Sequence, residues 1–439
     1  PRYIIPDYEK FFKNGSEFLQ LEPPTDFFEA LNDLLIIYKH VPSITNYPVY
    51  LGQLDYLLEP FITDMDDATV KKHLKLFFTN VDRTVLDSFS HADIGPKATR
   101  AGYLILEVQG ELENAIPNIS MKYDPEITDD DFALACVKCA LKTAKPSFAN
   151  HRMFKNELGE NYVIASCYNG LLLGGGAYTL CRLILGHIAE RSAGIEDFKN
   201  NQLPYVMDVM AKYMDARIAF EVEQSGFFES NFLAKEGLIH RDRFTGMFGL
   251  VGLADAVNVL MTKEGKDDRF GHSDAATQLG VEIMDIINEF NNNHFNKYCE
   301  GTGSHFLLHA QVGIAEDKGI APGTRIPIGE EPEELVDHLN VISNFHKYFV
   351  SGTGDIFPVD LTVHKNPEYV LDIIKGSWQK DIRYLSFYSS DSDVIRITGY
   401  LVKRSEIEKY EQGNAVLQNT TQLGTGAKKN GRILERKVR

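Results

Sequence analysis

Cysteine is scarce in this sequence, and its five copies do not form the pattern of a disulfide framework. An odd number of cysteines in a chain of 439 residues favours a reducing cytosol. Cys136 and Cys139 make the one Cys-x-x-Cys pair, and the sequence has no second pair to complete a zinc site. Because residues 130–143 have helical periodicity, we expect both cysteines in the core. His305 and His309 also lack a further ligand in register, so no metal site is predicted.

Basic side chains are in the minority as well. The sequence carries 45 lysines and arginines against 62 aspartates and glutamates, which gives a formal net charge of −17 at pH 7. Nucleic-acid binding requires a basic stripe, so this balance argues against such a partner and mainly favours solubility. No stretch makes a case for secretion or for a membrane span, and we expect a cytoplasmic protein.

The C-terminal tail is the exception to the acidic balance. We expect a solvated, mobile tail, because that is the usual fate of charge runs at chain ends. The sequence begins at Pro1 rather than at a methionine, which leaves open whether residues precede it. The basic residues of the tail, which face one acidic Glu435, are Lys428, Lys429, Arg432, Arg436, Lys437 and Arg439.

Apolar residues make up 44% of the sequence and charged residues 24%, which is ordinary for a soluble globular protein. Apolar residues recur at helical spacing in residues 27–38 and 51–58, so the region 1–80 is predicted to be helical. The polar stretch 82–95 is interpreted as a surface loop, with the lining of a site as the alternative. Residues 204–265 are again predicted to be rich in helix.

Strand and turn signals fill the middle of the chain. Alternation of apolar and polar residues predicts a strand over 117–123, and a buried strand over 161–166 runs into Cys167. Three glycines, 174–176, are expected to break the chain before a helix over 177–191. These glycines could cradle a phosphate, but no lysine, serine or threonine follows in Walker spacing, so a plain tight turn is favoured.

A glycine near the C-terminus lies inside a strand-like run. Gly399 falls within residues 394–402, which are rich in β-branched and other apolar side chains. Such a glycine weakens a strand and ordinarily marks a bulge or a close approach of the backbone. Ser405 and Glu408 then form a capping-box pattern, and Gly413 suits the end of the short helix that follows. Gly399 is therefore predicted to lie in a loop just ahead of a helix.

The residues around this glycine, Arg396-Ile-Thr-Gly399-Tyr400, resemble the Arg-Val-x-Gly-Tyr signature of glycyl radical enzymes. In that superfamily the glycine gives up a hydrogen atom from its Cα and stores an unpaired electron. A side chain would hinder the planar geometry of the radical, which is why the position is a glycine. The resemblance implies a radical on Gly399, supported by Arg396 and Tyr400, and no bound cofactor, because the backbone itself takes that role.

A second part of the chain carries the same resemblance. Residues 117–120, Pro146-Ser147 and 162–167 follow one another in the order expected of a pyruvate formate-lyase-like protein. In that superfamily a loop holds a cysteine beside the radical glycine. The resemblance therefore implies that Cys167 becomes a thiyl radical and abstracts hydrogen from substrate. The sequence looks closest to the YjjI-type group of the superfamily.

The resemblance also implies the fold, which is an α/β barrel of ten strands in two antiparallel five-stranded halves, with helices around it. Both loops would meet in the centre of this barrel, since water and oxygen quench radicals. The chain would then divide into a helical N-terminal region (1–80), a barrel core with the cysteine loop (81–390), and a glycyl radical domain with the basic tail (391–439).

Departures from the named branches of the superfamily bear on the reaction. The acyl-transfer branch has two adjacent cysteines, but the neighbour of Cys167 here is Ser166. The dehydratase branch has Cys-x-Glu, but Asn169 stands at that position and cannot act as a base at neutral pH. Class III ribonucleotide reductases have a C-terminal zinc site of four cysteines, which this sequence lacks. The polar residues expected to bind substrate are Asn169, Ser166, Ser147, Asn150 and His151.

These observations predict a glycyl radical enzyme that acts on a small polar metabolite in anaerobic metabolism. The alternative reactions are acyl transfer, as in a formate acetyltransferase, and carbon–carbon cleavage of a 2-oxo acid. An alternative of another class is a spare-part or scaffold protein that accepts a radical without binding a substrate of its own. The expected partners are a radical SAM activating enzyme and a small molecule, with no nucleic acid and no membrane, and a homodimer is left open.

Overall fold

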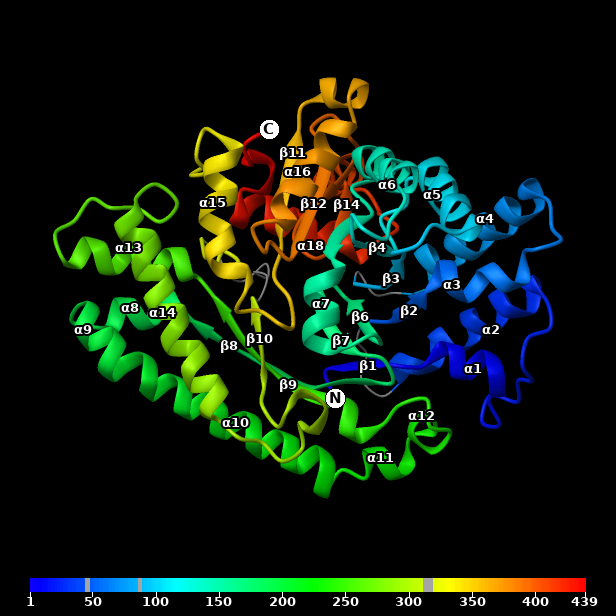
Figure 1. Ribbon diagram of the computed structural model, residues 1–439, viewed down its shortest axis with the longest axis horizontal. Coiled ribbons are helices and arrows are strands. Elements are labelled where there is room, and N and C mark those ends of the chain that lie inside the picture. Colours follow the sequence, from blue (N-terminus) through cyan, green and yellow to red (C-terminus); the bar gives the residue numbers. More distant parts are fainter. Residues whose placement is uncertain (44–47, 86–88, 311–318) are drawn as a thin grey trace.

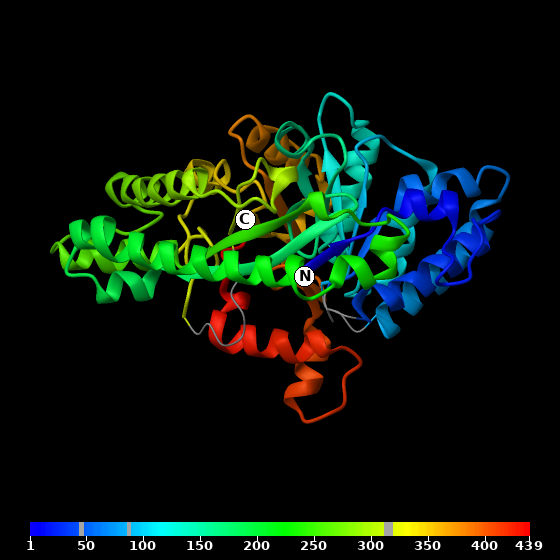
Figure 2. The same ribbon diagram turned by 90° about the horizontal axis from the view of Figure 1, so that it is seen from below.

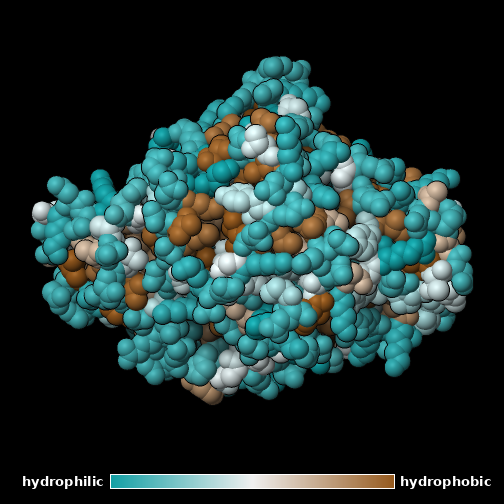
Figure 3. Space-filling view, turned by 45° about the horizontal axis from the view of Figure 1, so that its top comes forward, coloured by the Kyte–Doolittle hydropathy of each residue, from teal (hydrophilic) through white to brown (hydrophobic). Residues whose placement is uncertain are grey.

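The computed structural model describes residues 1–43, 48–85, 89–310 and 319–439. It has an α/β fold in which two sheets lie side by side and helices cover their outer faces (Figure 1). Most of the surface seen in Figure 3 is hydrophilic, with hydrophobic side chains exposed in separate small patches. None of the helices in the described ranges has the length and apolar character needed to cross a membrane.

The first sheet has four strands in the order β1-β8-β9-β10. They are β1 (Tyr3–Ile5), β8 (Gly175–Ile184), β9 (Phe244–Val251) and β10 (Leu307–Ala310). β1 pairs with β8 in antiparallel fashion, and the other pairs are parallel. Every residue of β9 is buried, as expected for a parallel strand that is covered on both faces.

The second sheet has six strands in the order β11-β12-β5-β4-β3-β2. β2 to β5 are mutually parallel, β12 runs antiparallel to β5, and β11 is parallel to β12. The six strands are β2 (Tyr50–Gln53), β3 (His91–Ile94), β4 (Asn118–Tyr123), β5 (Ser147–Asn150), β11 (Asp355–Val359) and β12 (Tyr384–Ser389).

The two sheets meet beside β10. The amide of Ala310 donates to Gly352 O at 3.2 Å, and the amide of Ser351 donates to Leu308 O at 3.3 Å. The chain just ahead of β11 therefore continues the hydrogen bonding of the first sheet. The α/β class is as predicted, but the hydrogen-bonded sheets have four and six strands rather than five each.

Two small hairpins stand apart from these sheets and carry the residues that the sequence singled out. The first consists of β6 (Tyr162–Ala165) and β7 (Asn169–Leu172), and Figure 1 shows it between the two sheets. The second consists of β13 (Val394–Arg396) and β14 (Leu401–Lys403). We call them the cysteine hairpin and the glycine hairpin.

Helices make up most of the remaining chain. Several begin with an acidic or hydroxyl side chain that binds the free N–H groups of the first turn, as Asp129 does for α6. The helices are α1 (Tyr8–Asn14), α2 (Phe27–His40), α3 (Leu54–Leu58), α4 (Asp67–Thr84), α5 (Arg100–Leu112), α6 (Asp130–Thr143), α7 (His151–Leu158), α8 (Leu185–Arg191), α9 (Ile195–Asp197), α10 (Leu203–Glu223), α11 (Phe227–Ser230), α12 (Phe232–Lys235), α13 (Leu253–Lys263), α14 (Asp274–Asn293), α15 (Leu335–His346), α16 (Glu368–Trp378), α17 (Arg404–Glu411) and α18 (Asn419–Gly431).

The N-terminal region, residues 1–80, is largely helical, as predicted, but it also contributes a strand to each of the two sheets. Helices α1 to α4 are present, but β1 joins the first sheet and β2 joins the second. The reason is steric. A Cβ at Gly176 in β8 would collide with Tyr3 O, so the glycines at this point let the two backbones approach closely. The N-terminal segment is thereby built into the central fold.

One helix prediction was wrong. Residues 177–184 belong to the strand β8, and only 185–191 are helical. Residues 204–265 are rich in helix, as predicted, and residues 244–251 within them form the strand β9. β8 begins with five consecutive buried residues, so it lacks the alternation that marks a half-buried strand. The glycines 174–176 therefore lead into a strand, and the phosphate cradle lacks its helix.

The C-terminal tail is packed against the protein, which corrects the expectation of a mobile tail. Figure 2 shows α17 and α18 as a layer on one side of the strands. A Cβ at Gly424 of α18 would contact Val402 of β14 at 3.1 Å, so the helix and the hairpin touch closely. The amide of Arg439 donates to Pro358 O of β11 at 2.8 Å. Thr420, Thr421 and Thr425 of α18 are buried, and Lys428 pairs with Glu411 of α17 at 2.8 Å.

Candidate active site

The cysteine hairpin presents a three-residue turn. Tyr162 pairs with Leu172 and Ala165 with Asn169, so residues 166–168 form the tip. Ser166 has φ +64°, which is uncommon for a residue with a side chain and makes the turn tight. Cys167 at this tip is 4% exposed. The strand expected over 161–166 and its run into the cysteine are confirmed.

Three side chains of the second sheet form a hydrogen-bond network that holds this tip. His91 of β3 donates from Nδ1 to Ser166 O, and its Nε2 accepts from Ser120 Oγ at 2.8 Å. The Tyr384 hydroxyl lies 2.8 Å from Ser120 Oγ and donates to Cys167 O at 3.0 Å. Burial lowers the pKa of His91 to about 3, so the imidazole is neutral, as these contacts require.

Two buried ionisable side chains, Asp93 and Lys122, support the base of the cysteine hairpin. Asp93 Oδ2 accepts from the Ile164 amide at 2.9 Å, and Lys122 Nζ donates to Tyr162 O at 2.9 Å. Burial raises the pKa of Asp93 to about 6 and that of the neighbouring Asp55 to about 8, although Lys122 partly opposes both shifts. Burial also lowers the pKa of Lys122. These groups fix the strand that ends at the cysteine.

The glycine hairpin presents a two-residue turn. Arg396 pairs with Leu401, and the Ile397 amide donates to Tyr400 O at 2.9 Å. Thr398 and Gly399 therefore form the tip. The helix α17 follows directly after β14, as predicted, and Gly413 with φ +81° lies just beyond its end.

The two tips touch. A Cβ placed on Gly399 would collide with both Cβ and Sγ of Cys167 and would lie 3.2 Å from its Cα. A carbon–carbon bond spans about 1.5 Å, so the Gly399 Cα lies within about 4 Å of the Cys167 sulfur. Gly399 is not among the glycines with positive φ. The position requires a glycine because of this close approach, and the backbone conformation does not demand one.

The pair is sealed from solvent. Burial raises the pKa of the Cys167 thiol, while hydrogen bonds from Ser166 and the Tyr168 amide oppose the shift. Ser166 Oγ lies 3.6 Å from Cys167 Sγ. At neutral pH the side chain of Cys167 is therefore a neutral thiol that still carries its hydrogen, and not a thiolate.

Three polar side chains hold the glycine tip. The amide nitrogen of Asn118 donates to Gly399 O. Arg396 is 1% exposed and donates through Nη2 to Asn118 Oδ1 at 2.9 Å and to Ala144 O at 3.0 Å. Arg436 donates to the carbonyls of residues 396 and 397, the first at 2.7 Å. The radical-loop role predicted for Arg396 is thus compatible with its place next to the glycine.

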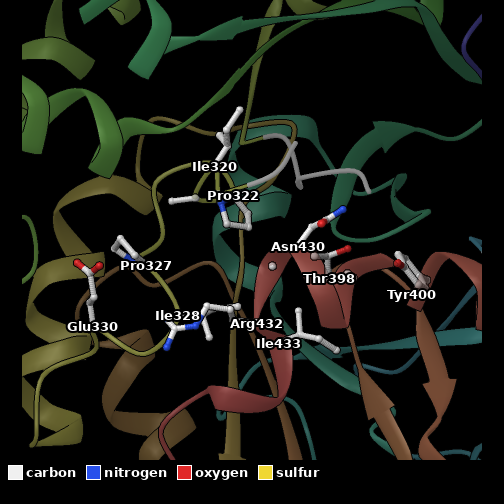
Figure 4. Close-up of a pocket in the computed structure, with 14 residues that line it drawn as sticks. Ile320, Pro322, Pro327, Ile328, Glu330, Thr398, Tyr400, Asn430, Arg432 and Ile433 are labelled. Atoms are coloured by element: carbon white, nitrogen blue, oxygen red, sulfur yellow. The ribbon is translucent and has the colours of Figure 1, made fainter. Parts of the chain in front are cut away.

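Tyr400, the other residue predicted to support this loop, is 6% exposed. Its ring packs edge-on against Phe89 at 5.3 Å between centroids. It also borders a cavity of about 180 Å³ between the glycine hairpin, the end of α18 and residues 319–330 (Figure 4). Thr398 faces the same cavity (Figure 4), and its Oγ1 has no partner in the described chain.

Asn169 is the predicted substrate-binding residue whose surroundings fit that role best. Its side chain is fully buried, yet neither amide atom has a hydrogen-bond partner among the described residues. Ser351 Oγ is also buried and has no hydrogen-bond partner among the described residues. The main-chain oxygen of Ser351 accepts from the Gly170 amide at 2.9 Å. Asn169, two residues beyond the cysteine, and Ser351 therefore belong to neighbouring backbone segments, and each has a buried polar side chain without a partner among the described residues.

The other predicted substrate-binding residues are engaged elsewhere. Ser147 Oγ bonds Ser386 Oγ at 2.7 Å. Asn150 caps α7 and donates to Ile382 O at 3.1 Å. His151 Nδ1 lies 2.9 Å from the Tyr162 hydroxyl. Among the described residues, no hydrogen bond links Asn150 or His151 to Cys167 or Gly399. The substrate-binding role of Asn150 and His151 stays a prediction.

The remaining cysteines and histidines show no second centre. Cys136 and Cys139 are buried in α6, as expected. His309 is buried in β10, and His305 Nδ1 lies 2.9 Å from His294 O. In the described part of the chain, no three histidine, cysteine or acidic side chains are grouped as a metal site requires.

Sequence reasoning missed the residues that position the two tips. His91 lies in the stretch 82–95 that was interpreted as a surface loop, but residues 91–94 form a fully buried strand. Residues 86–88 of that stretch lie outside the described residues. Asn118 and Ser120 were noted as part of a strand and of the resemblance, without a role of their own. The signal that could have found them is their alternation, which turns both side chains to the same face.

A glycine and a cysteine held in contact at the tips of two hairpins, inside an α/β fold, are the arrangement of a glycyl radical enzyme. Comparison with known proteins agrees. The family model described as "Glycyl radical enzyme YjjI-like" matches residues 1–439. The chain therefore belongs to the YjjI-like family of glycyl radical enzymes.

The chain is 48% identical over 442 residues to an uncharacterized protein of Haemophilus influenzae, which covers all of this chain and 85% of that protein. It is 43% identical over 440 residues to the uncharacterized protein YjjI of Escherichia coli, with coverage of 100% and 84%. Among solved structures it resembles an anaerobic ribonucleotide reductase (TM-score 0.74, 13% identity, 94% of this chain and 77% of that one). It also resembles the glycerol dehydratase of Clostridium butyricum (TM-score 0.72, 13% identity, 95% and 68%).

Proposed function

We propose that the protein stores a radical on Gly399 and uses Cys167 to abstract hydrogen from a small polar metabolite in anaerobic metabolism. The observation that carries this proposal is the contact between the two tips, in which any side chain at position 399 would overlap Cys167. Membership of the family and the intact glycine–cysteine pair favour an enzyme over a scaffold that only accepts a radical.

The chemistry follows from this contact. The Gly399 radical takes the hydrogen atom of the Cys167 thiol, which restores an ordinary glycine and leaves a sulfur-centred radical. That radical takes a hydrogen atom from a C–H bond of the substrate and becomes a thiol again. Return of a hydrogen atom from the thiol to the product radical, and from Gly399 to sulfur, closes the cycle. A bound cofactor has no part in these steps, and the short transfer distance is what proximity supplies.

The proposal includes the full barrel. The antiparallel joints β1/β8 and β12/β5, and the bonds that link β10 to the chain ahead of β11, support one ring. Its halves would be β1 to β5 in one direction and β8 to β12 in the other. This ring would enclose the two hairpin tips and exclude water and oxygen.

The lining favours a substrate with a hydroxyl or carbonyl group. A buried amide such as Asn169 that stays unpaired costs about 1–3 kcal/mol, which a polar substrate would recover and a hydrocarbon would not. Ser166 cannot hold an acyl group as a second cysteine would, and Asn169 cannot act as a base. Acyl transfer and cleavage of a 2-oxo acid are the alternative reactions, and Ser166 argues against the first.

Activation requires a partner. A radical SAM enzyme is proposed as the activase, in the cytoplasm. The test is to incubate the anaerobic protein with such an activase and S-adenosylmethionine and to record its electron paramagnetic resonance (EPR) spectrum. An organic radical signal that Gly399→Ala lacks is expected. The absence of any signal after proven turnover of S-adenosylmethionine by the activase would refute the proposal.

A further inference from the structure

Four arginine side chains are buried among the residues that the structure describes, and they differ in their surroundings. Arg383 forms a bidentate pair with Glu157, in which Nη2 lies 2.8 Å from Oε1. The other three bind only neutral carbonyl and amide groups, with no carboxylate at ion-pair distance in the described ranges. These three are Arg325, Arg396 and Arg436. A buried charge without a counter-charge is costly, so the region around the active pair has an unmet positive charge.

Arg325 lies at the tip of the cysteine hairpin. Its guanidinium carbon is 5.8 Å from the ring centroid of Tyr168, the residue that follows Cys167. Its Nε donates to Gly354 O at 2.6 Å. Residues 351–354, which supply this carbonyl, also supply the unpaired hydroxyl of Ser351. Arg325, Asn169 and Ser351 therefore border one backbone segment beside the cysteine.

The outer nitrogens of Arg325 are free to bind a ligand. Neither Nη atom has a hydrogen-bond or ion-pair partner in the described residues, although the side chain is only 9% exposed. Asp355 is the carboxylate whose charge interacts with that of Arg325, but it binds His346 at 3.0 Å and faces His338 at 3.7 Å. Arg383 has Glu157 as its partner, whereas no described residue supplies a counter-charge to the outer nitrogens of Arg325, and this contrast points to a bound anion there.

We infer that Arg325 binds an oxyanion of the substrate, a carboxylate or a phosphate, while Asn169 and Ser351 bind a hydroxyl or carbonyl group of the same molecule. This inference rests on the proposed function, because it names the substrate class of that site. The planar guanidinium fork matches both kinds of oxyanion. A small hydroxy or oxo acid, or the corresponding phosphate ester, would thus be held at both ends with a C–H bond toward Cys167.

The test uses the protein before activation, so binding is measured without any radical. Isothermal titration calorimetry compares three probes with one carbon skeleton: glycerate, glycerol 3-phosphate and neutral glycerol. At least one anionic probe is expected to bind more tightly than glycerol. Arg325→Gln should weaken that binding about 10- to 100-fold, the range for a hydrogen bond to a charged group, and should leave glycerol unaffected. Arg217→Gln, at an exposed arginine of α10, is the matched control and should bind as the wild type does.

The outcomes are distinct. A preference for glycerate identifies a carboxylate and a preference for glycerol 3-phosphate identifies a phosphate, and loss of either in Arg325→Gln supports the inference. Anion binding that Arg325→Gln leaves unchanged, or no anion binding to the wild type at millimolar concentration, overturns it. Arg325→Gln removes an uncompensated charge, so its melting temperature should not fall, which excludes misfolding as the cause. A missing Gly399 radical would refute the proposed function while leaving this binding result intact.

Discussion

The Cα of Gly399 lies within about 4 Å of the Cys167 sulfur, so the tips of two hairpins more than 200 residues apart in sequence are in contact. Neither tip is self-supporting. The cysteine tip depends on His91 and Tyr384, and the glycine tip depends on Asn118 and Arg436. Side chains of the second sheet and of the tail therefore hold two short turns in contact with each other.

Substitution of Gly399 by alanine should destabilise the protein even before activation. The new methyl group would overlap Cys167, and such overpacking costs about 1–3 kcal/mol. Urea unfolding would measure the loss. Gly376→Ala in α16 is the control, because nothing lies within 4 Å of its new Cβ and a helical alanine should stabilise by about 0.5–1 kcal/mol. Equal stability of Gly399→Ala and wild type would mean that the tips do not touch.

Cys167→Ser should separate storage of the radical from chemistry. The serine O–H bond is too strong for the glycyl radical to break, so the EPR signal should persist while consumption of substrate stops. Mass spectrometry of a metabolite extract incubated with activated protein would follow consumption. Cys181→Ser, at a partly exposed cysteine, should consume the same metabolites as the wild type. Full activity in Cys167→Ser, with loss in Cys181→Ser, would reverse the assignment.

Arg436→Met should loosen the glycine hairpin. The wild-type guanidinium donates to the carbonyls of residues 396 and 397, and hydrogen bonds from a charged group contribute about 1.5–3 kcal/mol each. Amide hydrogen exchange over residues 395–403 should therefore speed up at least tenfold, and activation should become faster. Arg432→Met is the control, because Arg432 is exposed and pairs with Glu435. Unchanged exchange in Arg436→Met would show that the tail does not restrain the hairpin.

Asp55→Asn should flatten the pH dependence of stability. Burial raises the pKa of Asp55 to about 8 in the folded protein. The unfolded carboxyl ionises near pH 4, so stability falls by about 1.4 kcal/mol per pH unit as pH rises from about 4 to 8. The variant lacks this loss, and its advantage over wild type should grow across that window in urea unfolding. Asp267→Asn, at an exposed site, is the control variant. If the stability of Asp55→Asn and that of the wild type changed in parallel with pH, the raised pKa of Asp55 would be contradicted.

Gly399 and Cys167 could be singled out from the sequence because the residues around them resemble the signature of glycyl radical enzymes. The local patterns alone, a glycine that breaks a strand-like run and a cysteine that ends one, are ordinary. The helix over 130–143 and the strand ahead of Cys167 were also predictable, since their spacing is local. What binds the tips was not, because His91 meets Ser166 only through tertiary packing.

The errors have a common cause. β8, which was predicted to be helical, begins with five consecutive buried residues and lacks the alternation that marks a half-buried strand. Arg325 could not be singled out from the sequence, because what distinguishes it is a tertiary feature, namely that no carboxylate of the described residues pairs with it. The tail was predicted as mobile from its charge, yet Arg436 turns inward to bind backbone carbonyls. Charge density alone does not reveal which cation of a run is buried.

The most direct test of the account is the EPR spectrum of protein activated after growth on glycine that carries deuterium at Cα. A radical on the Gly399 Cα retains one hydrogen there, which should split the signal of unlabelled protein into a doublet that deuterium collapses. Gly399→Ala should give no signal under the same conditions. A signal of unchanged shape in Gly399→Ala, or a doublet that survives deuteration, would place the radical elsewhere and contradict the account.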